Sequence, residues 1–336
     1  MLFRTWDKFI LGKKQKPDVI LFERFLEDNL FDLYSSLKDK TYTHGGYKSF
    51  FLRDPKVRHI HKATVKDRVI HHLVSYVLER LFEKTFYAHS YSCRQNKGTH
   101  KAVISFVKFA RKASHNNTSP LFVLKCDIRK FFASVDQEIL LRLLRERIKD
   151  PEFIWLLEEV IGSFSSEQTL GPLFPAKGMP IGNLTSQLFA NIYMDPFDQF
   201  MKHQLKVKYY IRYADDFIVM SDTKEYLDAV VPQIANFLEQ TLKLTLHPNK
   251  VSIRSYYLGI DFLGYIIFPH FILPRTKTKR RLLKKIQKKV LQVKSRKSTA
   301  EELEQTVNSY LGYLQHANAY KLSQTIKNQV WFWLSD

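Results

Sequence analysis

Two adjacent carboxylates, Asp215 and Asp216, are the residues of this sequence best suited to chemistry. They lie within residues 209–220, between two runs of apolar, β-branched and aromatic residues. This pattern predicts a strand, a tight turn and a second strand, with the acids at the tip. Neighbouring like charges repel each other unless they share a cation, and two divalent ions about 3.5–4 Å apart catalyse in-line phosphoryl transfer. The simpler alternative is an acidic turn exposed to water.

A third carboxylate, Asp127, follows an apolar run at residues 121–124 that is typical of a buried strand. Mg²⁺ prefers oxygen ligands and keeps positions open for substrate phosphates. Asp127 together with Asp215 and Asp216 therefore predicts a site for two Mg²⁺ ions, for which Mn²⁺ can substitute. Taken alone, Asp127 could equally cap a helix or lie on the surface after a strand.

The order of these motifs along the chain resembles the palm of reverse transcriptases. Asp127 is followed five residues later by the aromatic Phe132, and residues 213–216 are Tyr-Ala-Asp-Asp. Between them, residues 178–193 resemble the glycine loop and following helix of the same family. The resemblance extends from about residue 20 to the end of the sequence.

A subgroup of that family is indicated by residues 181–187, Ile-Gly-Asn-Leu-Thr-Ser-Gln. Ile181 and Gln187 stand where most retroviral and group II intron enzymes carry Gln and Pro. The pattern resembles the prokaryotic, group II intron-like reverse transcriptases of diversity-generating retroelements, as do residues 92–100 and 310–320.

The resemblance implies an α+β, right-hand polymerase fold with fingers, a palm of antiparallel strands and helices, and a short helical thumb. Changes in composition place the fingers at residues 1–115 and the palm at 116–268, with a fingers-like insertion around 150–180. The basic, helical thumb follows at 274–336. Palm helices are expected at 137–147 and 224–242.

Basic residues dominate the start of the predicted thumb. Residues 275–297 contain twelve Lys or Arg and no acid, and apolar residues recur at helical spacing. Like charges at this density destabilise an isolated helix, so we expect a nucleic-acid backbone to neutralise them, although a charge run is usually a solvated surface. The apolar positions are Leu282, Leu283, Ile286, Val290 and Val293, and the candidate nucleic-acid ligands are Arg275, Lys277, Lys279, Arg280, Arg281, Lys284 and Lys288.

The whole chain of 336 residues is basic, with 53 Lys and Arg against 33 Asp and Glu and a formal charge of +20. Such a charge attracts phosphate backbones, but it also suits an anionic membrane surface or a ribosomal protein. The sequence lacks a long apolar span and a secretory signal. Cys93 and Cys126 form no disulfide framework or zinc pattern, and Cys126 is expected to be buried. We expect a cytoplasmic protein with no membrane partner.

The resemblance also assigns residues to the incoming dNTP. Arg58 stands where the family has a fingers arginine, whose fork-shaped donors suit a triphosphate, and Lys56 or Arg53 could assist. Phe132 occupies the position of the sugar gate, where a ring excludes a 2′-hydroxyl, unless it is a core residue. The implied nucleotide ligands are Arg58, Ile128, Phe132, Ile181, Gly182 and Gln187, with Ile128 also at the metal site.

Further assignments concern the leaving group and the primer. Lys250, in a predicted palm loop at 246–252, could protonate the pyrophosphate or be one more surface lysine. Residues 259–265 resemble the hairpin that grips the primer end, with Phe262, Leu263 and Gly264 as the candidate contacts, although Gly264 could be an ordinary turn glycine. Arg68 is expected to pair with Asp67 or another acid for structure.

The function implied by the resemblance is RNA-directed DNA polymerisation, a nucleotidyl transfer that copies a template RNA into cDNA with low fidelity at adenines. The residues themselves support only the lower fidelity, because Ile181 cannot align a base pair by hydrogen bonding. The implied partners are template RNA, primer or cDNA, dNTPs and a small basic accessory variability protein. No nuclease segment is expected after the thumb.

Three alternatives remain open. The first is a group II intron-like or defence-associated reverse transcriptase with another mode of priming. The second is a non-catalytic, maturase-like RNA-binding protein, against which the intact acids argue. The third is a viral RNA-dependent RNA polymerase, which usually carries Gly-Asp-Asp and has no bulky sugar gate.

Overall fold

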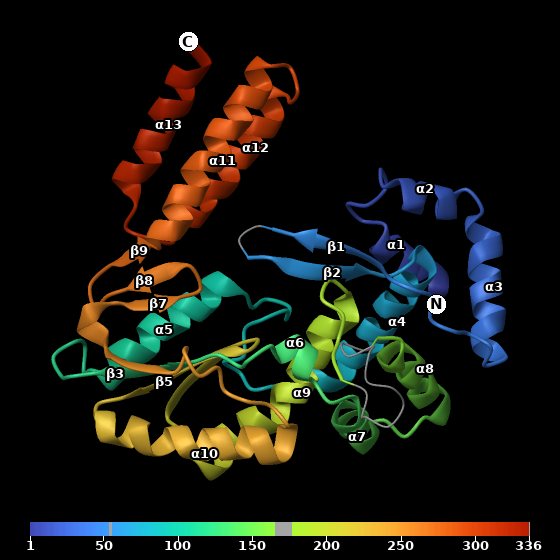
Figure 1. Ribbon diagram of the computed structural model, residues 1–336, viewed down its shortest axis with the longest axis horizontal. Coiled ribbons are helices and arrows are strands. Elements are labelled where there is room, and N and C mark those ends of the chain that lie inside the picture. The colour runs from blue at the N-terminus through green and yellow to red at the C-terminus, as the bar shows by residue number, and fades with distance from the viewer. Residues whose placement is uncertain (54–55, 165–176, 336) are drawn as a thin grey trace.

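The computed structural model describes residues 1–53, 56–164 and 177–335. Within this part of the chain, three antiparallel β-sheets are surrounded by helices (Figure 1). The largest sheet has four strands in the order β4-β5-β3-β6. Its strands are β3 (Phe122–Cys126), β4 (Tyr209–Tyr213), β5 (Asp216–Ser221) and β6 (Ser252–Ser255).

Apolar side chains alternate between the two faces of this sheet, as the two-residue period of a strand requires. Leu124 and Phe217 face one cluster with α9 and α10, whereas Val123 and Ile218 face a second cluster with α5. In Figure 1, α5 and α10 lie on opposite sides of the sheet. Burial of both faces fixes the register, because a one-residue slip would exchange the two sets. The helices are α5 (Thr99–Ala113), α9 (Leu184–Gln199) and α10 (Lys224–Leu242).

The N-terminal helices form a body beside the sheet, on the right of Figure 1. Helix α4 joins this body to the rest, since it packs against both α1 and α9. A two-stranded hairpin, β1–β2, extends from the body toward the C-terminal helices. The elements are α1 (Leu2–Phe9), α2 (Pro17–Glu23), α3 (Leu26–Lys38), β1 (Lys48–Leu52), β2 (Arg58–Lys62) and α4 (Val65–Phe82).

The two helices expected within the palm are both present, α7 at 137–147 and α10 at 224–242. The carboxylate of Asp136 begins α7 by accepting the backbone N–H of Glu138 at 3.0 Å, which satisfies a donor that the helix leaves free. Part of the expected insertion around 150–180, residues 165–176, lies outside the described residues. The shorter elements here are α6 (Phe131–Ser134), α7 (Gln137–Arg147), α8 (Pro151–Gly162) and the turns η1 (Phe200–Gln204) and η2 (Tyr256–Leu258).

The C-terminal region is a bundle of three helices above a small three-stranded sheet (Figure 1). Leu282, Ile286 and Val290 of α11 are buried in the bundle, and Leu283 and Val293 pack against them, so the predicted apolar seam is confirmed. The elements are β7 (Ile260–Phe262), β8 (Tyr265–Ile267), β9 (Ile272–Pro274), α11 (Thr276–Lys294), α12 (Ala300–Leu314) and α13 (Tyr320–Ser335).

Helix α5 packs against β4 and β5, although its residues precede the expected boundary at 115. The central sheet therefore recruits a helix from the N-terminal part of the chain. The remaining domain boundaries stay predictions.

Two expectations from composition can be compared with this architecture. Cys126 is buried in the core beside the sheet, as expected, whereas Cys93 is exposed. In the described part of the chain, none of the helices combines the length and the apolar character needed to cross a membrane.

Candidate active site

The two adjacent acids lie at the tip of the β4–β5 hairpin. Tyr213 pairs with Asp216, so the loop between the strands consists of Ala214 and Asp215 alone. Ala214 has φ 54°, in the left-handed region that two-residue hairpin loops use. This conformation costs a residue with a Cβ atom about 1–2 kcal/mol, so neighbouring contacts must hold the turn.

Asp127 reaches the same end of the sheet as this turn. Cys126, the last residue of β3, pairs with Phe217 of β5, so Asp127, the residue after the strand, comes beside Asp216. Asp127 and Asp216 line one pocket of about 320 Å³. The structure thus brings together carboxylates that lie far apart in the sequence.

The ionised forms of the two hairpin acids are destabilised by their surroundings. Burial raises the pKa of Asp215 to about 6, and the nearby carboxylates of Asp216 and Asp127 act in the same direction. Burial also raises the pKa of Asp216, with Lys125 opposing the shift. Lys250 offsets part of this charge, since its Nζ lies 2.7 Å from Asp127 Oδ1. A bound divalent cation would offset much more.

The donor set fits a hard divalent cation, because it consists of carboxylate oxygens with few competing nitrogen or sulfur ligands. Across residues 1–53, 56–164 and 177–335, however, no three His, Cys, Asp or Glu side chains already converge as a metal cluster. Asp127 instead contacts Lys250. Coordination by all three acids requires Lys250 to leave Asp127 and the carboxylates to turn toward one another.

Cations from distant segments line the same pocket. Lys56 lies between strands β1 and β2, and Arg275 immediately precedes α11. Arg275 forms an ion pair with Asp261, and Lys125 Nζ donates to the Asp261 carbonyl at 2.9 Å. The pocket is therefore bounded by the N-terminal hairpin, the central sheet and the base of the C-terminal bundle.

A second pocket, of about 600 Å³, contains two of the six residues that the sequence placed at the nucleotide. Phe132 and Ile181 both line it, together with His59 and His61 of β2. The backbone N–H of His61 donates to the Ile181 carbonyl at 3.0 Å, which attaches the hairpin to this loop. The aromatic and apolar lining suits the base and sugar of a nucleotide.

Gly182 shows why the loop after Ile181 needs glycine. Its φ is +118°, which residues with side chains rarely adopt. A Cβ atom there would also lie 2.8 Å from the Ile60 side chain. The close approach of this loop to β2 therefore depends on the missing side chain.

The other nucleotide candidates differ in accessibility. Arg58 is exposed at the start of β2, and Gln187 is exposed near the start of α9. Ile128 is fully buried, so only its backbone can reach a ligand. Phe131 is buried as well and packs edge-on against Phe132.

The candidate primer-grip residues form the β7–β8 hairpin. Leu263 and Gly264 make its two-residue turn, with φ values of 48° and 94°. The Phe262 side chain is fully buried, so it supports the hairpin rather than offering a surface. Tyr313 of α12 donates its hydroxyl to the Gly264 carbonyl at 2.6 Å, and the Tyr265 hydroxyl donates to the Tyr313 carbonyl at 2.9 Å.

Residues 52–267 match the family model "Reverse transcriptase (RNA-dependent DNA polymerase)". This chain belongs to the reverse transcriptase family. The match covers strand β2, the central sheet with its acids, and the β7–β8 hairpin.

Curated relatives of this reverse transcriptase include bacterial proteins. It is 26% identical to protein YkfC of Escherichia coli strain K12 over 242 residues, which cover 62% of this chain and 63% of that protein. It is 23% identical over 310 residues to the group II intron-encoded protein LtrA of Lactococcus lactis subsp. cremoris, covering 72% of this chain and 50% of LtrA. The chain thus spans between half and two thirds of these relatives.

Solved structures with a similar fold include telomerases. Apo telomerase from Candida tropicalis, truncated from its C-terminal domain, matches with TM-score 0.51 and 15% identity over 68% of this chain and 54% of that chain. Candida albicans telomerase in complex with a TWJ fragment of telomeric RNA matches with TM-score 0.51 and 13% identity over 73% and 49%. The likeness concerns the fold, and it confirms the α+β, right-hand arrangement of fingers, palm and thumb.

The basic residues of the reverse transcriptase thumb lie mostly on the outside of α11. The buried seam faces α12 and α13, so the other side of the helix carries the charge. Lys289, which was not among the candidates, pairs with Glu302 of α12 at 2.8 Å. Of the candidates, Arg275 and Arg281 are partly buried and Lys277, Lys279, Arg280, Lys284 and Lys288 are exposed.

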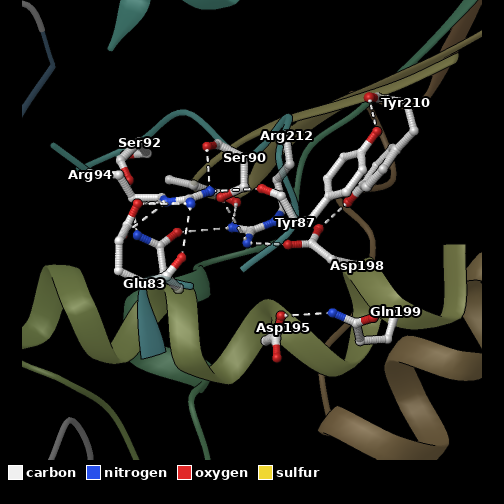
Figure 2. A network of polar contacts seen from close by, with 12 residues as sticks. Glu83, Tyr87, Ser90, Ser92, Arg94, Asp195, Asp198, Gln199, Tyr210 and Arg212 are labelled. Atoms are coloured by element: carbon white, nitrogen blue, oxygen red, sulfur yellow. Dashed lines mark hydrogen bonds and ion pairs between the residues drawn. The ribbon is translucent and has the colours of Figure 1, made fainter. Parts of the chain in front are cut away.

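A buried arginine that sequence reasoning missed supports the β4–β5 hairpin (Figure 2). Arg212 of β4 is fully buried and forms a two-pronged ion pair with Asp198 of α9. Its Nη1 also donates to the Ala214 carbonyl at 3.2 Å. The only signal in the sequence is a charged residue inside an otherwise apolar strand.

Arg68 has the structural role that was expected for it, with a different partner. It pairs with Asp18, which also contacts Lys62 at 2.6 Å. Asp67 is buried instead among Thr64, Tyr42 and the backbone of Gly45. The pairing with an acid is confirmed, and the acid is the one on α2.

Proposed function

We propose that this chain is an RNA-templated DNA polymerase in which Asp127, Asp215 and Asp216 hold two Mg²⁺ ions, or Mn²⁺ in their place. The observation that carries the proposal is the pocket in which Asp127 and Asp216 meet cations from the fingers hairpin and the thumb base. A polymerase needs this arrangement, because acids for metals and cations for phosphates must surround one reacting centre.

The chemistry of the metal pair is common to nucleotidyl transfer: when bound, the ions supply an activated primer 3′-hydroxyl and a stabilised pyrophosphate leaving group. Lys250 would be released from Asp127 if that carboxylate held a metal, and its ammonium could then donate a proton to the pyrophosphate. Lys56 and the exposed Arg58 are available to the triphosphate from the fingers hairpin.

The substrate would be a deoxynucleotide held in the pocket that Phe132 and Ile181 share. The Phe132 ring would occupy the space of a ribose 2′-hydroxyl. Ile181 presents an apolar side chain where related enzymes have glutamine, so it holds the nascent base pair without a hydrogen bond. Gly182 and Gln187 flank this position, and the Ile128 backbone could contribute to the metal site.

The nucleic acid would lie between the palm and the thumb. The exposed cations of α11 supply its backbone contacts, and the turn at Leu263 and Gly264 lies where the primer end would be held. Such contacts are electrostatic, so binding should weaken steeply with salt.

Within the family, we assign the chain to the diversity-generating retroelements. The assignment rests on Ile181 and Gln187, and the adenine selectivity it implies comes from the resemblance. Mutagenic copying at template adenines would then require a structured template RNA and a small basic accessory variability protein. A group II intron-like enzyme with other priming is the alternative, and the LtrA relationship is compatible with it.

Primer extension on an RNA template, with dNTPs or rNTPs, tests the polymerase proposal. We expect Mg²⁺-dependent extension with dNTPs and little with rNTPs. Extension that prefers rNTPs would indicate an RNA polymerase, and binding of the template without extension would indicate a maturase-like protein.

Deep sequencing of the cDNA tests the subgroup. Ile181→Gln should lower misincorporation opposite template adenines relative to the wild type, because the glutamine restores a polar contact to the nascent pair. The matched control is Ile181→Leu, which keeps the side chain apolar and should keep the error spectrum. An unchanged spectrum in Ile181→Gln would remove Ile181 from the explanation.

A further inference from the structure

Arg212 and Asp198 form a buried ion pair (Figure 2), and Arg212 also contacts the turn between β4 and β5. Both side chains have 0% exposure. Arg212 Nε lies 2.8 Å from one carboxylate oxygen of Asp198, and Nη2 lies 2.5 Å from the other. Burial opposes the charge of Arg212, but Asp198 raises its pKa, so the guanidinium stays charged.

The remaining donors of Arg212 connect three segments. Nη1 donates to the Ala214 carbonyl at 3.2 Å and to Asn191 Oδ1 of α9 at 3.3 Å. Nη2 also donates to Ser90 Oγ at 3.3 Å. Tyr210 adds its hydroxyl to Asp198 at 2.7 Å. The pair thus links helix α9 and the segment around residue 90 to the turn.

Arg212 acts on the turn from the face of the sheet that is away from the pocket. It pairs in register with Phe217, which belongs to the cluster facing α9 and α10. Asp216 points to the other face, where it lines the pocket with Asp127. Contact with the Ala214 carbonyl is therefore the route by which Arg212 can influence the acids.

The turn needs such support. Ala214 has a left-handed φ of 54° without being glycine, and the acids that follow repel each other. A rigid guanidinium with paired donors fixes the position of the carbonyl better than a flexible ammonium could. Residues that orient metal ligands in this way typically change metal affinity when they are replaced.

We propose that Arg212 and Asp198 are positioning residues that hold the Ala214–Asp215 turn in the geometry that binds divalent metal. This inference rests on the metal site of the proposed function. It adds a determinant of metal affinity that is separate from the three proposed ligands and does not contact the ion.

The test measures Mn²⁺ binding to the purified full chain without nucleic acid, by electron paramagnetic resonance, and compares it with the folded fraction. Asp216→Asn identifies the part of the signal that belongs to this site. We expect Arg212→Lys to weaken that binding about tenfold. The Mg²⁺ concentration for half-maximal primer extension should rise by a similar factor, whereas partial unfolding alone would lower the amplitude and leave this midpoint unchanged.

Arg94→Lys is the matched control. Arg94 is also largely buried and forms a two-pronged pair with Glu83, but its described contacts run to the backbone of Tyr87 and Ser90 rather than to the turn. Its Mn²⁺ affinity should stay within about twofold of the wild type, since no ligand-bearing segment loses a hydrogen bond. Equal losses in both variants would overturn the proposal.

Tyr210→Phe covers the case in which Arg212→Lys does not fold. It removes one hydrogen bond to Asp198 and keeps the ion pair, so we expect about a twofold loss of Mn²⁺ affinity. An unchanged affinity per folded molecule would overturn the proposal, as would a wild type that binds no Mn²⁺. If Mn²⁺ binding responds as expected but the wild type extends no primer, the polymerase proposal fails and the positioning pair stands.

Discussion

The Arg212–Asp198 and Lys250–Asp127 pairs lie on opposite faces of the central sheet, near the turn of the β4–β5 hairpin. Arg212 and Asp198 are both completely buried, whereas the side chains of Lys250 and Asp127 are 42% and 14% exposed. The first pair shares its groups with α9 and the turn, and the second consists of one lysine contact of 2.7 Å.

This difference separates a permanent contact from an exchangeable one. Breaking a buried pair leaves an uncompensated charge without water. An exposed pair loses little when one partner is replaced, because solvent takes over. Asp127 can therefore exchange Lys250 for another partner, whereas Asp198 stays paired with Arg212.

The largest expected effect concerns the activity that depends on Asp127. Asp127→Asn should reduce primer extension by at least about 10³-fold, because a metal ligand contributes several kcal/mol to transition-state stabilisation. The folded state should persist. Asp222→Asn, an exposed acid just after β5, is the matched control. A variant of Asp127 that kept a tenth of the activity would contradict the assignment.

The next effect separates the pairs by stability. Asp198→Asn should lower the free energy of unfolding by about 3–5 kcal/mol, because Arg212 is left buried and unpaired. Lys250→Ala should change it by less than about 1 kcal/mol, since its pair is exposed. Urea denaturation of the metal-free protein measures both. Similar losses in the two variants would remove the distinction.

The smallest effect concerns pH. The pKa of Asp215 is raised to about 6 in the folded protein, first by burial. The protonated form is therefore favoured by folding, and this stabilisation is present below about pH 4 and lost as the pH rises to about 6. Relative to Asp215→Asn, the metal-free wild type should lose about 2–3 kcal/mol between pH 4 and pH 7.

Unfolding of both proteins in a chelator, at several pH values, measures this difference. Mg²⁺ at pH 7 should restore stability to the wild type and much less to Asp215→Asn. A difference in stability that stays constant across the pH range would show that burial does not raise the pKa of Asp215.

The acidic hairpin tip was predictable from the sequence, whereas the buried ion pair that supports it was not. Asp215 and Asp216 are adjacent and flanked by strand patterns, and strand periodicity places them at a tip. Arg212 and Asp198 are separated by a π-turn and a loop, and nothing in their spacing indicates that they meet. Their pairing depends on how α9 packs under the sheet.

The sequence did not predict which polar side chains far apart in the chain would pair. Arg68 was expected to pair with an acid, and the partner is Asp18 on α2 rather than the neighbouring Asp67. Phe262 lies in the predicted primer hairpin, but its alternation in β7 turns it into the core. Sequence spacing fixes the face of an element, whereas the choice of partner is decided by tertiary packing.

The rings of Tyr265 and Tyr313 stack with their centroids 4.7 Å apart, the Tyr265 hydroxyl donates to the Tyr313 carbonyl, and the Tyr313 hydroxyl donates to the Gly264 carbonyl. These contacts have a mechanical consequence. Because α12 is hydrogen-bonded to the tip at Gly264, a rigid-body movement of the helical bundle would move that tip with it. Under the proposed binding of nucleic acid along α11, this link would keep the primer end in register with the bound duplex.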